Sequence, residues 1–285
     1  MFAITGISGQ VGGAVARALL AAGRPVRAVV RDPAKGEPWA RQGCEVALAS
    51  LDDAGALRSA FAGCDGVFFV LPPVFDPAPD FAETRRVVAA VRDALDATRP
   101  ARLVSLSTIG AQATRSNLLS QHGLQEAALG ALPIPVTFLR AAWFMENAAW
   151  DVAPAREMGV VPSFLQPLDR AIPMVATADV GTAAAALLQE SWTGRRVVEV
   201  ESARVAPNDL AAALARALRR DVRAQAVPRA SWHDLFAAQG MSNPGPRIAM
   251  LDGFNEGWIG FDGDAASRRQ GATTLDAVIG ALVRR

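Results

Sequence analysis

The chain begins MFAITGISGQVGGAVARALLAAG (residues 1–23), in which three regularly spaced glycines follow a short apolar run. That run, Phe2–Thr5, has the composition of a buried strand. Apolar residues then recur at helical spacing through Val11–Ala22, and Gly23 separates this stretch from a second apolar run, Pro25–Val30. The predicted order is therefore strand, glycine turn, helix and strand.

The three glycines have separate physical roles in such a turn. Gly6 allows a tight turn, Gly9 lets the backbone approach a pyrophosphate, and Gly12 lets the helix pack closely against the strand. The helix N-terminus adds unpaired N–H groups and a positive dipole end, which favour a bound phosphate. The pattern predicts a dinucleotide-binding turn; an ordinary strand-turn-helix without a ligand is the alternative.

Composition argues against several other functions. The 285 residues carry 29 basic and 28 acidic side chains, a balance that predicts neither a nucleic-acid partner nor a membrane surface. The sequence shows no basic leader with an apolar core and no apolar stretch long enough to span a bilayer, so we expect a cytoplasmic location. Cys44 and Cys64 lack Cys or His neighbours at metal-binding spacing, so we expect structural thiols and no metal.

Strand and helix patterns alternate along the first half of the chain. Apolar strands such as GVFFVL (Gly66–Leu71) and RLVSLS (Arg102–Ser107) are separated by helical patterns. This alternation predicts an α/β fold with a Rossmann-type doubly wound parallel sheet. We expect a dinucleotide-binding domain at residues 1–140, with 171–200 packing back onto it, and a smaller, mostly helical substrate cap at residues 141–285.

The second strand ends in VVRDPAK, which bears on the choice of cofactor. An NAD-binding unit places an acidic residue here to bind the ribose hydroxyls, and Arg31 stands there instead. A guanidinium can hold a 2′-phosphate in bidentate fashion. Asp32 follows immediately, and it could neutralise Arg31 or serve NAD. The position favours NADP (NADPH) over NAD.

Several further motifs match one family. Besides GISGQVGG and VVRDPAK, the chain contains LDD, SLSTIGA, HGLQEAALGALPIPVTFLRAAWFMENAA, DVG and the closing RRQGATTLDAVIGAL. Together these motifs resemble the NmrA-like family of atypical short-chain dehydrogenases over nearly the whole chain. The layout is most similar to its NAD(P)H:quinone oxidoreductase, triphenylmethane reductase and azoreductase-like members. The same family includes redox-sensing regulators that bind the dinucleotide and catalyse nothing.

The resemblance implies a Rossmann fold and a set of residues in contact with NADP. Ser50 departs from the family pattern, because many relatives carry an aspartate near the adenine at this position, and the adenine contact is left unassigned. The implied cofactor-binding residues are Gly6, Ile7, Ser8, Gly9, Gln10, Val11, Arg31, Leu71, Pro72, Pro73, Ser107 and Thr108.

The proton relay of typical short-chain dehydrogenases is missing. Those enzymes use a Tyr, with a Lys four residues later that also holds the ribose, and this chain has no tyrosine. Counted along the helix from Glu126, His122 falls at the Lys position and Leu118 at the Tyr position. His122 and Ser107 are the candidate catalytic residues that remain. A hydrogen-bonded core histidine is the competing interpretation of His122.

An aromatic segment, WFMENAAW, follows the sixth predicted strand. Trp143 and Phe144, with Phe75 from an earlier loop, would line a pocket for a flat substrate. Asn147 would fix the loop or the substrate, because a buried amide needs hydrogen-bond partners. The aromatic residues could instead fill the core beneath the cap.

These residues predict an enzyme, an NADPH-dependent reductase of flat, electron-poor organic acceptors such as quinones or dyes. Such acceptors take a hydride without a dedicated acid, so the positioning of two flat rings would supply most of the catalysis. The alternatives are an NADP(H)-sensing regulatory protein without catalysis, and a biosynthetic reductase or epimerase. The expected partner is a small aromatic or quinone-like substrate, and a homodimer is left open.

Overall fold

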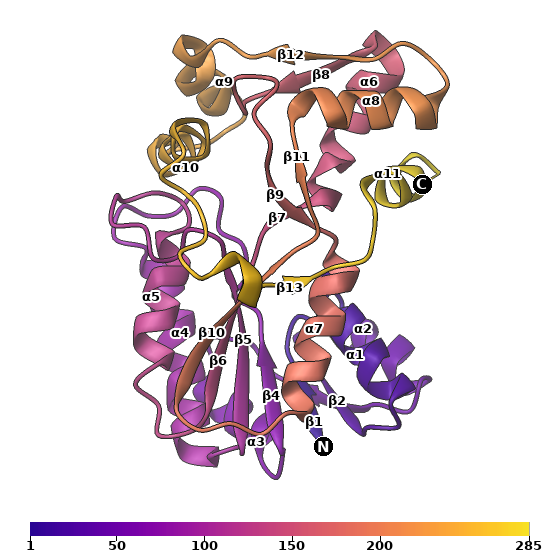
Figure 1. The fold of residues 1–285 in the computed structure, drawn as a ribbon. Helices are drawn as coiled ribbons and strands as arrows, with labels where there is room; N and C mark the ends of the chain where they lie inside the picture. Colours follow the sequence, from indigo (N-terminus) through magenta and orange to yellow (C-terminus); the bar gives the residue numbers. More distant parts are fainter. Residues whose placement is uncertain (285) are drawn as a thin grey trace.

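Strands that are buried on both faces build the centre of the structure. In the computed structural model, which describes residues 1–284, eight strands form one parallel sheet (Figure 1). Val67 and Phe69 pack on one face of this sheet and Phe68 on the other, which is why their strand needs cover on both sides. In spatial order the strands are β13 (Arg269–Gln270), β10 (Arg195–Glu201), β6 (Val136–Ala141), β5 (Arg102–Thr108), β4 (Gly66–Phe69), β1 (Phe2–Ile4), β2 (Val26–Val30) and β3 (Glu45–Leu48).

Helices cover both faces, as a doubly wound sheet requires. The strand order from β3 through β1 to β6 is that of dinucleotide-binding folds, so the predicted Rossmann-type sheet is confirmed. One face carries α1 (Gln10–Ala21), α2 (Pro33–Ala40) and α7 (Thr177–Gln189). The other carries α3 (Ala54–Phe61), α4 (Ala82–Thr98) and α5 (Ser120–Leu129).

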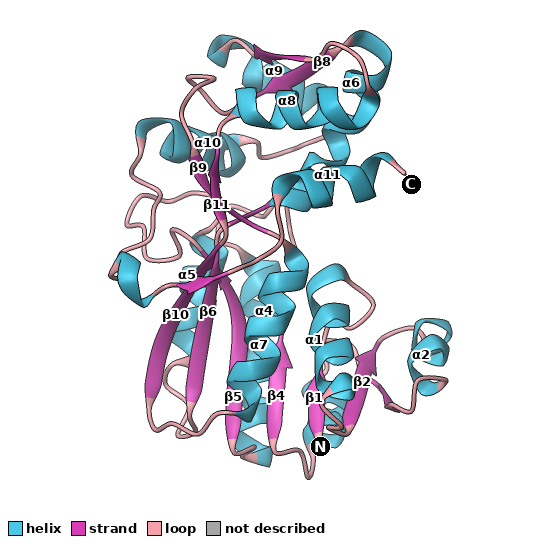
Figure 2. Ribbon diagram, turned by 45° about the vertical axis from the view of Figure 1, so that its right-hand side comes forward, coloured by secondary structure: helices cyan, strands magenta, loops and turns pink. Residues whose placement is uncertain are grey.

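The cap lies beyond the carboxyl ends of the strands (Figures 1 and 2). It has an apolar core of its own, in which Trp232 and Phe236 are the largest fully buried side chains. Its elements are β7 (Trp143–Phe144), the 3-10 helix η1 (Met145–Asp151), α6 (Val152–Met158), β8 (Val160–Ser163), β9 (Ile172–Val175), β11 (Ala203–Val205), α8 (Pro207–Leu218), β12 (Arg223–Ala226), α9 (Trp232–Ala238), α10 (Gly245–Glu256) and α11 (Leu275–Val283).

The chain returns to the main sheet after it has entered the cap. β10 pairs with β6, and the short β13 pairs with the far edge of β10. Asp179, in the first turn of α7, accepts hydrogen bonds from the backbone N–H and the hydroxyl of Thr273, each at 2.9 Å. The segment before α11 is thereby attached to the sheet lobe. The division proposed at residue 140 stays a prediction.

The sequence pattern does not predict the helix α2. Gly36 and Pro38 lie inside it, and both residues normally weaken a helix. Its first turn is stabilised by Asp32, whose carboxylate accepts a hydrogen bond from the backbone N–H of Ala34 at 3.0 Å. Trp39 is buried against the sheet. Capping and burial together outweigh the poor local propensity.

Two glycines allow α1 to pack with its backbone in direct contact. A Cβ on Gly12 would lie 2.3 Å from the carbonyl oxygen of Gly6 in the turn. A Cβ on Gly181 of α7 would lie 2.3 Å from the Cβ of Ala14 in α1. Neither position has room for a methyl group, so the glycines fix how closely α1 approaches the turn and α7.

Gly181→Ala should destabilise the fold, because the added methyl group has no space between α7 and α1. Overpacking of this kind costs about 1–3 kcal/mol, to be measured as a loss in the free energy of unfolding in urea. Gly55→Ala is the matched control: Gly55 is exposed in α3, where a Cβ would meet only the Asp53 carboxylate at 3.4 Å. That change should stabilise by about 0.5–1 kcal/mol. Equal effects of the two substitutions would contradict the close packing of α1 on α7.

Candidate active site

The glycine turn between β1 and α1 has one face open to solvent. Gly6 has a φ of +60°, which residues with a side chain rarely adopt. Gly9 and Gln10 are exposed, whereas Ile7 and Val11 are buried beneath them. A Cβ on Gly9 would meet only the Gly6 carbonyl oxygen, at 3.2 Å. Because no side chain caps α1 at this end, its first N–H groups are free to bind an anion. The turn therefore fits a dinucleotide pyrophosphate.

Arg31 at the end of β2 is exposed and forms no ion pair with any carboxylate of residues 1–284. The Asp32 carboxylate is directed to the start of α2, where it accepts a hydrogen bond from the backbone N–H of Ala34, and it forms no ion pair with Arg31. Asp52 accepts a 2.5 Å hydrogen bond from the Ser50 hydroxyl and lies 3.6 Å from Arg86. The Arg31 charge contributes to the lowered pKa of Asp52, after the Ser50 hydrogen bond, but the guanidinium forms no ion pair within residues 1–284 and is available for a phosphate.

The loop after β4 begins inside the protein and then emerges. Leu71 is buried, and Pro72 and Pro73 are exposed. Gln121 of α5 donates a hydrogen bond to the carbonyl oxygen of Val74 at 3.0 Å, which fixes the loop beside the helix that carries His122. The contacts of these loop residues with the cofactor stay predictions.

Ser107 at the end of β5 is buried and its hydroxyl donates to the Glu126 carboxylate at 2.6 Å. Arg140 of β6 binds the same carboxylate through two hydrogen bonds of 2.9 and 2.7 Å. Since its proton is engaged by Glu126, the Ser107 hydroxyl can offer a substrate only its oxygen lone pairs. Thr108 is partly exposed beside it. A catalytic role for Ser107 stays a prediction.

His122 lies in the first turn of α5, and its Nδ1 is buried without a partner in the described chain. Burial lowers the pKa of His122 from 6.5 to about 4, against the opposing effects of Gln125 and the Glu126 charge. The ring is therefore neutral at neutral pH and does not carry an imidazolium proton. Leu118, at the tyrosine position, is buried in the apolar core of the cap.

The segment WFMENAAW forms β7 and η1. Trp143 packs edge-on against Phe254 of α10, with ring centroids 5.3 Å apart. Phe144 is partly buried against the core of the sheet lobe. Asn147 is exposed, so the expectation that its amide is buried is wrong. Contacts of Trp143, Phe144 and Asn147 with a substrate stay predictions.

Glu146, which the sequence reasoning did not select, is the residue that fixes this segment. Its carboxylate accepts hydrogen bonds from the backbone N–H of Thr177 at 2.9 Å and from the Thr177 hydroxyl at 2.7 Å. The same hydroxyl lies 3.2 Å from Oε1 of Gln10, the first residue of α1. Glu146 thus connects the cap to the phosphate-binding end of α1. The sequence did contain a signal for this role, because Glu146 is the one acidic residue in the largely apolar segment WFMENAAW.

Phe75 and Asp76 join the sheet lobe to the cap. The Phe75 ring contacts Trp150 of η1 edge-on, with centroids 6.2 Å apart, although the two residues are 49% and 67% exposed. Asp76 accepts hydrogen bonds from the backbone N–H groups of Ser242 (2.8 Å) and Asn243 (2.6 Å), just before α10. Phe75 and Trp150 therefore form an aromatic wall where the sheet lobe meets the cap, and the Asp76 hydrogen bonds hold the two lobes together beside it.

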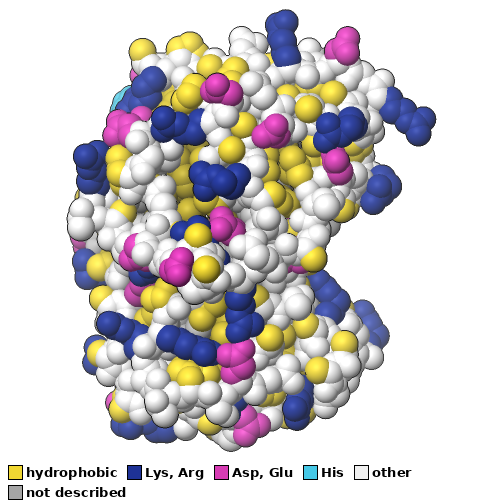
Figure 3. Space-filling model, viewed as in Figure 1, with side chains coloured by type: hydrophobic (Ala, Val, Ile, Leu, Met, Phe, Trp, Pro, Cys, Tyr) yellow, Lys and Arg dark blue, Asp and Glu magenta, His cyan; other side chains and the backbone are white. Residues whose placement is uncertain are grey.

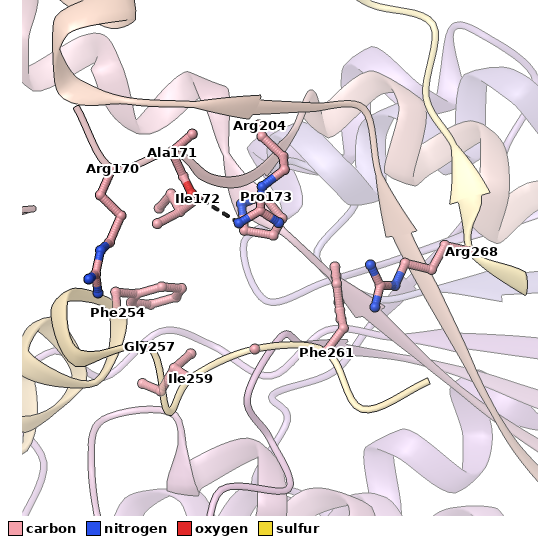
Figure 4. Close-up of a pocket in the computed structure, with 11 residues that line it drawn as sticks. Arg170, Ala171, Ile172, Pro173, Arg204, Phe254, Gly257, Ile259, Phe261 and Arg268 are labelled. Carbon is pink, nitrogen blue, oxygen red and sulfur yellow. Dashed lines mark hydrogen bonds between the residues drawn. The ribbon is translucent and has the colours of Figure 1, made fainter. Parts of the chain in front are cut away.

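Figure 3 shows the surface hollowed between the lobes, with α11 above the hollow and α1 and α2 below it. A separate cavity of about 380 Å³ lies where β9 and β11 face the segment after α10 (Figure 4). None of the predicted site residues lines this cavity. The lining residues are Arg170, Ala171, Ile172, Pro173, Arg204, Phe254, Gly257, Ile259, Gly260, Phe261 and Arg268.

Residues 1–284 contain no group of three His, Cys, Asp or Glu side chains arranged to hold a metal ion. Within that range, too, no helix has the length and apolar character needed to cross a membrane. Both cysteines are buried and unbridged. A cytoplasmic location, a homodimer and the lack of a nucleic-acid partner stay predictions.

Most of the chain, including the glycine turn and part of the cap, matches the model of a known family. The model of the NmrA-like family matches residues 1–243. The chain belongs to this family. The resemblance that the sequence motifs predict is therefore confirmed, and the match extends well into the cap.

Individual proteins are similar to this chain along most of their length. Quinone oxidoreductase 2 from Escherichia coli (strain K12) is 30% identical over 203 residues, which cover 70% of this chain and 68% of the relative. The NAD(P)H azoreductase of Xenophilus azovorans is 28% identical over 264 residues, 90% of this chain and 85% of the relative. The solved structure of an NADPH-dependent quinone oxidoreductase from Escherichia coli, complexed with NADPH, superposes with a TM-score of 0.81 at 25% identity and covers 99% of both chains.

Protonation of His122 should destabilise the folded protein at acidic pH. The pKa in the fold, about 4, lies below the usual 6.5, so the unfolded chain binds the proton more tightly. Stability should therefore fall as the pH drops below about 6.5, and His122→Gln should lose less melting temperature than the wild type between about pH 7 and about pH 5. His233→Gln is the control, because the His233 side chain is 69% exposed. Parallel pH profiles for wild type and His122→Gln would contradict a buried neutral ring.

Proposed function

We propose that the protein is an NADPH-dependent reductase of flat, electron-poor organic acceptors, with quinones and dyes as substrates. The observation that carries the proposal is an open phosphate-binding turn combined with a site whose tyrosine position holds the buried Leu118. Without an acid at that position, the acceptor must be one that takes a hydride readily.

The relatives support the same chemistry. One is a quinone oxidoreductase, another is an azoreductase, and the matching solved structure of an NADPH-dependent quinone oxidoreductase contains NADPH. Quinones and azo compounds share flat conjugated systems that are poor in electrons. A single site with a hydride donor and an aromatic wall suits both.

Four parts of the chain would hold the cofactor. The backbone of Gly6–Val11 would bind the pyrophosphate and the free Arg31 the 2′-phosphate. Thr108 and the neutral ring of His122 would hydrogen-bond the ribose and amide on the nicotinamide side. Bound NADPH supplies the hydride.

Water would supply the proton that completes the reduction. A quinone becomes a hydroquinone by gaining one hydride and one proton, so two electrons and two hydrogens are accounted for. His122 is neutral and the Ser107 proton is engaged by Glu126, which leaves neither side chain as a strong acid. The chain's contribution is then to position the two rings.

Oxidation of NADPH in the presence of menadione tests the proposal. We expect turnover of about 1–10³ s⁻¹, with one quinone reduced per NADPH. Gly9→Val is the control, because the new Cβ meets only the Gly6 carbonyl oxygen within the protein yet occupies the open face of the turn. This variant should lose NADPH binding and turnover but only about 1 kcal/mol of folding stability, because valine is a poor N-cap for α1. Tight binding of NADPH without oxidation by any quinone or dye would refute the reductase and support the sensing alternative.

Arg31→Ala should reduce the preference for NADPH over NADH. Hydrogen bonds to a charged group contribute about 1.5–3 kcal/mol, which corresponds to about tenfold to hundredfold in the ratio of the two dissociation constants. Arg41→Ala should leave the ratio unchanged, since Arg41 lies at the far end of α2 and its side chain is 71% exposed. Equal affinities for NADPH and NADH in the unmodified protein would remove the basis for this role of Arg31.

A further inference from the structure

Arg247 of α10 carries a charge that no carboxylate of residues 1–284 neutralises. The side chain is partly buried, and its one hydrogen-bonding contact runs from Nη1 to the sulfur of Met241 at 3.7 Å. Burial lowers the pKa of Arg247, and no acidic group opposes that effect. Buried arginines are normally paired, because a desolvated charge without a partner is costly. An anion from outside residues 1–284 would therefore be the natural partner for Arg247.

Two aromatic rings, the fully buried Phe236 and the exposed Trp150, lie near this guanidinium. Its central carbon lies 4.4 Å from the ring centroid of Phe236 and 6.0 Å from that of Trp150. Trp150 in turn contacts Phe75, and both rings are largely exposed. An aromatic ring attracts a cation but has no net charge, so these rings do not neutralise the guanidinium. The result is an accessible aromatic wall with an uncompensated positive charge at one end.

The first turn of α10, which carries Arg247, contacts the position of the missing tyrosine. The backbone N–H of Leu118 donates a hydrogen bond to the carbonyl oxygen of Pro246, the residue before Arg247, at 2.8 Å. Asp76, next to Phe75, holds the backbone that leads into α10. Arg247 thus lies on the side of the molecule where α5 and the loop after β4 meet the cap.

We propose that Arg247 binds an acidic group of the aromatic acceptor, so that the protein selects acceptors that carry an oxyanion such as a sulfonate or a carboxylate. The planar guanidinium offers paired N–H donors that match such groups. Trp150 and Phe75 would contact the flat ring that bears the acid. This inference rests on the proposed function, because it names the substrate class of the same site.

Kinetics with a matched pair of acceptors test the role of Arg247. The wild type should have a higher kcat/KM for naphthoquinone sulfonate than for menadione, and Arg247→Met should reduce that preference at least about tenfold. The substitution should raise KM for the sulfonate, whereas kcat/KM for menadione should change by less than about twofold. Arg247→Lys, which keeps the charge and loses the planar fork, should retain part of the preference.

Arg229→Met is the control variant. Arg229 also lies over an aromatic ring, 4.9 Å from the centroid of Trp232, but it is paired with Asp252 at 2.7 Å. Its removal takes the same charge from the same lobe and should leave the preference unchanged. If Arg229→Met and Arg247→Met lost the preference for the sulfonate equally, the effect would come from the overall charge of the cap, and the inference would be overturned.

Equilibrium binding of two compounds that cannot be reduced separates this inference from the proposed function. With NADP present, the wild type should bind naphthalene sulfonate more tightly than naphthol, and Arg247→Met should abolish the difference. That result would support the anion site even in a protein that oxidises no NADPH. Reduction of quinones with no preference for the sulfonate would overturn the inference and leave the reductase intact. If Arg247→Met fails to fold in a thermal melt, Arg247→Gln decides the same comparison.

Discussion

The contact of α1 with its surroundings, backbone against backbone, is the constraint on which the site depends. Because Gly12 has no side chain, α1 packs directly against the glycine turn. Because Gly181 has none, α7 packs directly against α1. These contacts fix the direction of the first free N–H groups of α1, so the phosphate site is rigid before any ligand arrives. The cap is attached at the same place, since Glu146 binds the start of α7 beside Gln10.

The sequence predicts those features that depend on neighbours along the chain. Glycine spacing and apolar periodicity identify β1, the turn, α1 and the exposed Arg31, because each is a local pattern. The sequence does not predict features that depend on contacts between residues far apart in the chain. Trp39 finds its burial only in the folded protein, and of the adjacent Glu146 and Asn147 only the first is held by α7. Nor can a sequence show that Arg247 has no acidic partner.

A buried ion pair between Arg140 and Glu126 lies behind the site. Glu126 is 13% exposed and Arg140 7%, and the pair is completed by the Ser107 hydroxyl on one side and by Asp262, 2.8 Å from Arg140, on the other. Burial is the largest influence on the pKa of His122, and the Glu126 charge, which is paired with Arg140, opposes it only in part. The Arg140–Glu126 pair thus leaves little net charge directly behind Ser107 and His122, which suits an acceptor that needs positioning more than protonation.

β6 is buried along its whole length, and one of its edges is completed by β10, a strand that lies beyond much of the cap in the chain. During synthesis that edge has no partner until residues 195–201 have left the ribosome. An open, apolar strand edge pairs readily with other chains. Until residue 201 has been made, the growing protein therefore needs protection of this edge, for example by a chaperone, and fragments that end before residue 195 would be prone to aggregate however well their N-terminal half folds.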